Sequence, residues 1–159
     1  LKEHVGESFN LAGYTIGVAT LTGIVLGIRW FMNAIGSPIL GTIADRIGRE
    51  RTIAFLFLCG ATALIINGIH SDPIILTILV LIFFISGDTV YNLLTAQAGK
   101  SGTFPLASFM TALDLGRSLG PLMAWGIVQI GFSANYLFIS SGIIYMIGVV
   151  ISFKQITHK

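Results

Sequence analysis

Five long apolar stretches follow one another in this chain and constrain its fold more than any other feature. They cover about residues 13–41, 52–69, 73–97, 104–130 and 135–153. An α-helix of roughly 20 apolar residues crosses the ~30 Å hydrocarbon layer of a bilayer, and each stretch is close to this length or above it. Only short polar segments separate the stretches. The sequence therefore predicts an all-α, polytopic membrane protein with five transmembrane helices.

Charge is scarce along the whole chain. Of the 159 residues, 10% are charged and 54% are hydrophobic, whereas a soluble domain is typically about one quarter charged. So little charge cannot coat a water-exposed surface, which favours lipid as the surrounding medium. The net charge of +2, with no basic stripe between aromatic residues, does not indicate nucleic acid as a partner.

The basic residues outside the apolar stretches are distributed unevenly. If the five helices alternate in direction, one side of the membrane has only Lys2, and the other has Arg46, Arg49, Arg51, Lys100, Lys154 and Lys159. Cytoplasmic loops carry the excess of lysine and arginine in membrane proteins. The charged loop 41–52 and the C-terminus are therefore expected in the cytoplasm, in a plasma membrane or a bacterial inner membrane.

The charged loop, GTIADRIGRERT, carries both signs of charge between the first two apolar stretches. Gly41 allows close helix packing, and Gly48 can adopt the positive φ of a tight turn. Asp45 can cap a helix or pair with an arginine. The arginines Arg46, Arg49 and Arg51 can contact anionic headgroups. From these residues alone, the loop is interpreted as an anchor that fixes topology.

Charged residues occur inside three of the five stretches, with polar residues near them at helical spacing. The candidates for a polar pathway are Arg29, Asn33, Asp88, Tyr91, Asn92, Asp114 and Arg117. Spacings of three and four place those of each helix on one face. A charge inside a bilayer costs a few kcal/mol, so it requires a partner or water. We therefore expect the first, third and fourth helices to face a polar pathway, and the second and fifth to face lipid.

The partners of these charges remain open at this point. Asp114 and Arg117 can pair on their own helix, as a structural ion pair or near the membrane surface. Helical rise places Asp88 and Asp114 at similar depth, and we hypothesise that they compete for Arg117, so that the unpaired carboxylate can carry a proton. For Arg29 we favour a carboxylate of another helix over an anionic group of a substrate.

Two prolines interrupt the hydrogen bonding of their helices. Pro38 is expected to kink the first helix, and Pro121 the fourth. Gly116 and Gly120 form a small-residue face that allows close contact between helices. We expect a hinge or tight packing at Gly120–Pro121.

The charged loop resembles a known family signature. Its Gly41, Ala44-Asp45-Arg46, Gly48 and Arg49 resemble the G-x-L-a-D-R-x-G-R-[RK] motif of the major facilitator superfamily. Ile43 replaces the usual leucine, and Glu50 replaces a basic residue. The stretch 114–121, DLGRSLGP, is similar to the glycine- and proline-containing stretch on the fifth and eleventh helices of that superfamily.

The resemblance implies a partial domain over residues 1–159, made of helices eight to twelve of a six-helix half whose first helix is missing. The Arg29-Trp30 pair is similar to eighth-helix sequence; a truncated first half, helices two to six, is the alternative. The chain begins with Leu1, without the features of a signal peptide, and we expect it to be a piece of a longer protein. In the family the charged loop is a conformational latch, so Asp45 would dock on a helix end of the missing N-terminal half.

The implied function is secondary transport of a small solute by alternating access, with proton coupling and direction left open. The expected partners are membrane lipids, the solute and the missing half. No cofactor or metal is expected, because Cys59 is the lone cysteine and His4, His70 and His158 lie outside the spans. No hydrolase, metalloprotease or phosphate-loop motif indicates an enzyme. A non-transporting membrane scaffold or a membrane-embedded enzyme subunit is the alternative.

Overall fold

The computed structural model describes residues 8–11, 14–70 and 72–157. A short antiparallel hairpin, β1 (Ser8–Leu11) and β2 (Tyr14–Gly17), pairs Ser8 with Gly17 and Leu11 with Tyr14. Five long helices follow in the described chain: α2 (Val18–Ile47), α3 (Arg49–Ile69), α4 (Pro73–Ser101), α5 (Thr103–Gln129) and α6 (Ala134–Thr157). Apart from the hairpin the described structure is therefore helical, and five helices lie near the five predicted stretches. The first boundary differs, because residues 14–17 form β2 and α2 continues to Ile47. The segment 41–52, expected to be a loop, is thus helical on both sides of Gly48.

Local chemistry explains where two of the helices begin. At the start of α4, the Asp72 carboxylate accepts hydrogen bonds from the backbone N–H groups of Ile74 and Ile75, at 2.9 and 3.1 Å. Pro73 follows this cap at the first helical position. Proline has no backbone N–H, and an N–H at this position would have no acceptor within the helix. Between α2 and α3 a single residue reverses the chain. This is Gly48, whose φ of 108° confirms the predicted positive-φ turn.

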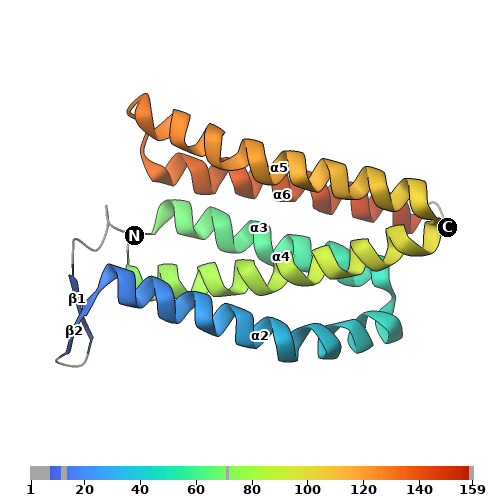
Figure 1. Ribbon diagram of the computed structural model, residues 1–159, viewed down its shortest axis with the longest axis horizontal. Helices are drawn as coiled ribbons and strands as arrows, with labels where there is room; N and C mark the ends of the chain where they lie inside the picture. The colour runs from blue at the N-terminus through green and yellow to red at the C-terminus, as the bar shows by residue number, and fades with distance from the viewer. Residues whose placement is uncertain (1–7, 12–13, 71, 158–159) are drawn as a thin grey trace.

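The helices form a bundle in which α3 is central. Helix α3 packs most extensively against α6 and α4, whereas α2 and α5 pack mainly against α4. The buried cluster beside the charged loop consists of Ala44, Ile53, Leu56, Val90 and Leu93. Figure 1 shows the α2–α3 turn, the α4–α5 turn and the C-terminus at the same end of the bundle. This arrangement gathers the charged segments at that end.

Glycines allow α3 and α6 to approach closely. A Cβ atom placed on Gly142 would lie 2.7 Å from Ile65 Cγ1 and 3.3 Å from the Ala61 carbonyl oxygen. A Cβ on Gly148 would lie 2.9 Å from the Phe57 ring. Larger residues at these positions would clash with the neighbouring helix, so the interface requires glycine at both positions.

Helix α3 is enclosed on one side by α4 and α6, whose close approach its small residues allow, and it exposes Phe55 and Ile69 elsewhere. The expectation that this helix faces lipid stays a prediction. Close packing was also expected at Gly41 and Gly116, and a hinge or tight packing at Gly120–Pro121, but a Cβ at any of these three glycines would meet no atom within 4 Å. The close-packing prediction is therefore wrong for the described structure, and the hinge stays a prediction. Helix α5 has no buried residue, so its glycines have no close neighbour among the described residues.

Three of the described helices, α3, α4 and α6, are long and apolar enough to cross a membrane, which is consistent with a membrane protein. Helix α2 contributes a fourth span if its two segments, Thr22–Gly36 and Pro38–Ile47, count as one. These segments meet at an angle of 46°, which confirms the kink predicted at Pro38. Helix α5 continues through Pro121. It is long enough to cross a membrane but not apolar enough, because charged, hydroxyl and glycine residues interrupt its apolar sequence. The five-span count is therefore not confirmed.

The α3–α6 interface gives a direct stability prediction. Gly142→Ala adds a methyl group where the Ile65 side chain and the α3 backbone leave no space, so it should lower the free energy of unfolding by about 1–3 kcal/mol. Gly116→Ala is the matched control in an open helical position and should leave stability unchanged or raise it by up to about 1 kcal/mol. Unfolding in detergent micelles, followed by circular dichroism, measures both variants. Equal stability of the two variants would contradict the packing described here.

Candidate functional site

An ion pair between Arg29 of α2 and Asp88 of α4 is the main polar contact between these helices. The guanidinium donates from Nε to Asp88 Oδ2 at 3.0 Å and from Nη2 to Oδ1 at 2.8 Å. This two-point geometry is the strongest arrangement of arginine with a carboxylate. The side chains are 29% and 21% exposed, so the pair is largely withdrawn from the surface. The predicted pairing of Arg29 with a carboxylate of another helix is therefore confirmed.

Aromatic rings surround the Arg29 guanidinium. Its central carbon lies 4.2 Å from the centroid of the Phe84 ring and 5.9 Å from that of Trp30. A cation over an aromatic face gains electrostatic stabilisation when few water molecules compete. Asp88 and Phe84 are four residues apart on α4 and so lie on the same face of that helix. The Arg29 guanidinium thus contacts both the Asp88 carboxylate and the Phe84 ring, which belong to the same helix.

A second polar cluster lies between α4 and α5. Arg117 Nη1 is 3.9 Å from Asp114 Oδ1, and these side chains are 63% and 75% exposed. The predicted pairing on one helix is confirmed, but a long contact in an exposed position contributes little energy. The Arg117 guanidinium also lies 5.4 Å from the centroid of the Tyr91 ring, which stacks with Phe109 at a centroid distance of 6.4 Å. Arg117 is therefore held more loosely than Arg29.

The two clusters adjoin along α4, because Tyr91 lies one helical turn after Asp88. In this conformation Asp88 pairs with Arg29, and Arg117 pairs with Asp114. The competition of the two carboxylates for Arg117 is not seen here and stays a hypothesis. Asn33 and Asn92 lie one turn after Arg29 and Asp88 on α2 and α4, Asn33 half-buried and Asn92 exposed. Together these residues form a polar stripe across α2, α4 and α5.

The charged loop lies at the end of the bundle where the C-terminus also lies. Asp45 Oδ1 accepts a hydrogen bond from Arg49 Nε at 2.8 Å, which confirms the predicted pairing of Asp45 with an arginine. Arg46 precedes this pair in the last turn of α2 and is exposed, and Gly41 lies one turn earlier. The predicted docking of Asp45 on a helix end of another half has no partner among the described residues and stays a prediction.

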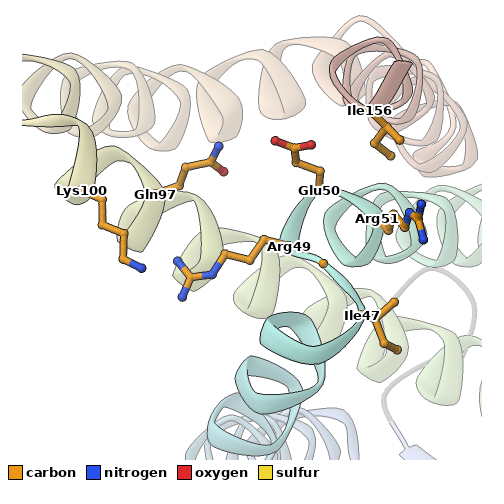
Figure 2. Close-up of a pocket in the computed structure, with 8 residues that line it drawn as sticks. Ile47, Arg49, Glu50, Arg51, Gln97, Lys100 and Ile156 are labelled. Carbon is orange, nitrogen blue, oxygen red and sulfur yellow. The ribbon is translucent and has the colours of Figure 1, made fainter. Parts of the chain in front are cut away.

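A hollow of about 640 Å³ opens beside this loop (Figure 2). We call it the basic hollow; its lining residues are Ile47, Gly48, Arg49, Glu50, Arg51, Gln97, Lys100 and Ile156. They come from the α2–α3 turn and from the ends of α4 and α6. The prediction that the loop, Lys100 and the C-terminal segment share one end is confirmed for these described residues.

Aromatic residues are the part of the site that the polar pattern missed. Phe84 and Phe109 contact the two arginine clusters, and Tyr145 of α6 packs edge-on against Phe57 and Phe83, with ring centroids 5.4 and 5.3 Å away. Of these aromatic residues, only Phe84 could have been assigned to the site from the sequence, because it lies four residues before Asp88 and therefore on the same face of the helix. The other contacts depend on which helices are neighbours, and the spacing of residues does not reveal this.

Comparison with protein-family models, with curated proteins and with solved structures finds no match to this chain. Functional inference therefore depends on the geometry of the site. The site consists of a tightly paired arginine, a loosely paired arginine, and a basic hollow at one end. Charged groups inside apolar helices are costly and in membrane proteins often mark functional sites, which favours a functional role for them beside their structural one.

The Arg29–Asp88 pair gives the stability prediction for the site. Arg29→Gln leaves Asp88 without a counter-charge, and we expect a loss of about 2–3 kcal/mol, below the range for fully buried pairs because both side chains are partly exposed. The double variant Arg29→Met with Asp88→Leu should recover part of this loss. Arg117→Gln, the exposed control, should cost at most about 1 kcal/mol. Detergent unfolding curves measure all three, and equal effects of Arg29→Gln and Arg117→Gln would contradict the distinction.

Proposed function

We propose that this chain is part of a secondary transporter that moves a small solute through a membrane by alternating access. The observation that carries the proposal is the bidentate Arg29–Asp88 pair between two long, largely apolar helices. A bilayer-spanning helix that serves only as an anchor has no use for an arginine or an aspartate in its interior. Intramembrane charges instead mark pathways for ions and substrates in transport proteins.

The arrangement of the polar stripe supports the same proposal. It lies on α2, α4 and α5, and α5 leaves its Asp114–Arg117 pair exposed on the described surface. In the proposal these helices face the solute pathway, with the missing N-terminal half on its other side. All five long helices are then spans, including α5, because water in the pathway solvates the polar residues of that helix.

The charged loop takes the role of the latch in this proposal. Asp45 and Arg49 are already paired within the loop, and both remain partly exposed, at 60% and 28%. A partly exposed carboxylate can still bind a helix N-terminus of the other half, because the helix dipole attracts negative charge there. The loop and the C-terminus are cytoplasmic in this arrangement, following the excess of basic residues.

The proposal distinguishes a transporter from a membrane scaffold or an enzyme subunit. A scaffold would tolerate neutral replacements in the polar stripe with little consequence beyond stability. An enzyme would need a nucleophile with its base, and the polar stripe of the described residues holds paired charges instead. These differences decide how the transport experiment is designed.

The transport experiment uses the full-length protein in sealed membrane vesicles with a panel of labelled solutes. At least one solute should accumulate, and Asp88→Asn should lower its initial rate at least about tenfold, as expected for loss of a charge-assisted contact worth about 1.4 kcal/mol or more. Lys154→Gln, at the end of α6 and outside the stripe, is the control and should transport normally.

Proton coupling is tested on the same vesicles. If Asp88 takes part, a protonophore stops accumulation by the unmodified protein, and the residual transport of Asp88→Asn loses its dependence on pH. An unchanged pH dependence in this variant removes Asp88 from the coupling mechanism. A failure of every solute in the panel, with correctly folded protein, would favour the scaffold.

A further inference from the structure

A second, mainly apolar hollow lies beside the basic hollow. We call the second one the apolar slot; its volume is about 200 Å³, and its lining residues are Glu50, Ile53, Phe57, Leu94, Gly148, Ile151 and Ser152. Glu50 lines both hollows, so it marks their junction. The slot reaches from the charged end of the bundle into the apolar part. A charged compartment and an apolar compartment therefore meet at the end of the spans.

The shape of the slot follows from how the helices pack. Helices α4 and α6 both pack against α3, whose Ile53 and Phe57 form the floor between them. Leu94 of α4 and Ile151 of α6 line the sides. At Gly148 the Phe57 ring packs directly against the backbone of α6, since a Cβ there would lie 2.9 Å from the ring. The lining of the slot is mainly apolar, which suits part of a hydrocarbon chain.

The basic hollow has the charge to hold an anion. Its lining contains three cations, Arg49, Arg51 and Lys100, against the single carboxylate of Glu50. Figure 2 shows the Arg49 and Lys100 side chains extending toward each other across the opening, with Gln97 above them. Arg49 donates from Nε to Asp45 Oδ1, so this carboxylate offsets part of the charge of Arg49, and the terminal nitrogens take no part in that bond. Within the described residues, Arg51 and Lys100 form no ion pair.

We propose that these two hollows form one binding site for an anionic glycerophospholipid of the phosphatidylglycerol type. The phosphate lies between Arg49 and Lys100, and the Gln97 amide and the Glu50 carboxylate face the hydroxyl groups of the headgroup. One acyl chain lies in the apolar slot on Ile53 and Phe57. Basic pockets between membrane helices recognise anionic headgroups through the same chemistry. The site depends on the membrane assignment alone and is independent of transport.

The lipid also has a structural consequence. The basic hollow contacts the α2–α3 turn and the ends of α4 and α6, which come from separate parts of the chain. A bound headgroup would reduce the repulsion between the basic residues of the turn and Lys100 of α4, and would connect these segments at one end. Phosphatidylglycerol should therefore raise the unfolding temperature of the protein more than phosphatidylcholine does, because a ligand of the folded state stabilises that state.

The test counts bound lipids on the purified chain by native mass spectrometry. The protein is mixed in detergent with equal amounts of phosphatidylglycerol and phosphatidylcholine that have identical acyl chains. The unmodified protein should retain phosphatidylglycerol preferentially. Arg49→Gln with Lys100→Gln should lower that retention by about twentyfold to thirtyfold, from roughly 1 kcal/mol for each basic residue. Arg46→Gln with Lys154→Gln removes the same charge outside the lining and should retain the preference.

The apolar slot is tested by a matched pair of bulky substitutions. Ile151→Trp fills the slot and should lower retention several-fold, whereas Ile147→Trp, equally exposed on α6 but outside the lining, should have no effect. Circular dichroism checks that each variant is folded. If the double variant does not fold, Lys100→Gln alone replaces it, because Lys100 is exposed.

Three results would overturn the proposal. The first is an absence of preference for phosphatidylglycerol in the unmodified protein. The second is an equal loss of preference in both charge-removing double variants, which would show only a general attraction of the charged surface. The third is displacement of the lipid by inorganic phosphate together with no effect of Ile151→Trp. This last result would identify a site for free phosphate instead.

Discussion

The bidentate bond between Arg29 and Asp88 is the interaction on which the arrangement of this bundle depends. It joins α2 to α4 through two short hydrogen bonds, and the Phe84 ring covers the guanidinium at 4.2 Å. In an apolar surrounding neither charge can lose its partner without a large penalty. Helix α2 has few other anchors, since most of its side chains are exposed. The position of α2 therefore depends on this ion pair together with Ala44, which packs into the buried cluster beside the charged loop.

Two different kinds of contact hold the bundle together. The α3–α6 contact is made of glycines and large apolar side chains, and its geometry leaves no space for a second arrangement. The contacts of α4 with α2 and α5 include charged and aromatic groups. In the proposed transporter the first kind of contact would form a rigid unit, and the second kind would change between states. In the proposed transporter, movement occurs at the polar contacts while α3 and α6 stay together.

The sequence predicted the positions of the helices, the kink at Pro38 and the polar faces, because apolar length and helical spacing are local properties. It also predicted that Asp45 pairs with an arginine, since Arg49 lies four residues away. It did not identify Asp88 as the partner of Arg29, because that contact depends on how α2 crosses α4. The small-residue spacing of Gly116 and Gly120 was misleading. The same spacing serves a close contact only where a neighbouring helix is present, as it is at Gly142.

The account requires that the polar stripe faces water while the outer face of α6 faces lipid. Spin labels at Ser118→Cys on α5 and Ile147→Cys on α6, both in a Cys59→Ser background in lipid vesicles, measure this most directly. Both positions are exposed and lie near the middle of their helices. The label at 118 should collide more often with a water-soluble nickel chelate, and the label at 147 with dissolved oxygen. A preference for oxygen at both positions would contradict the account.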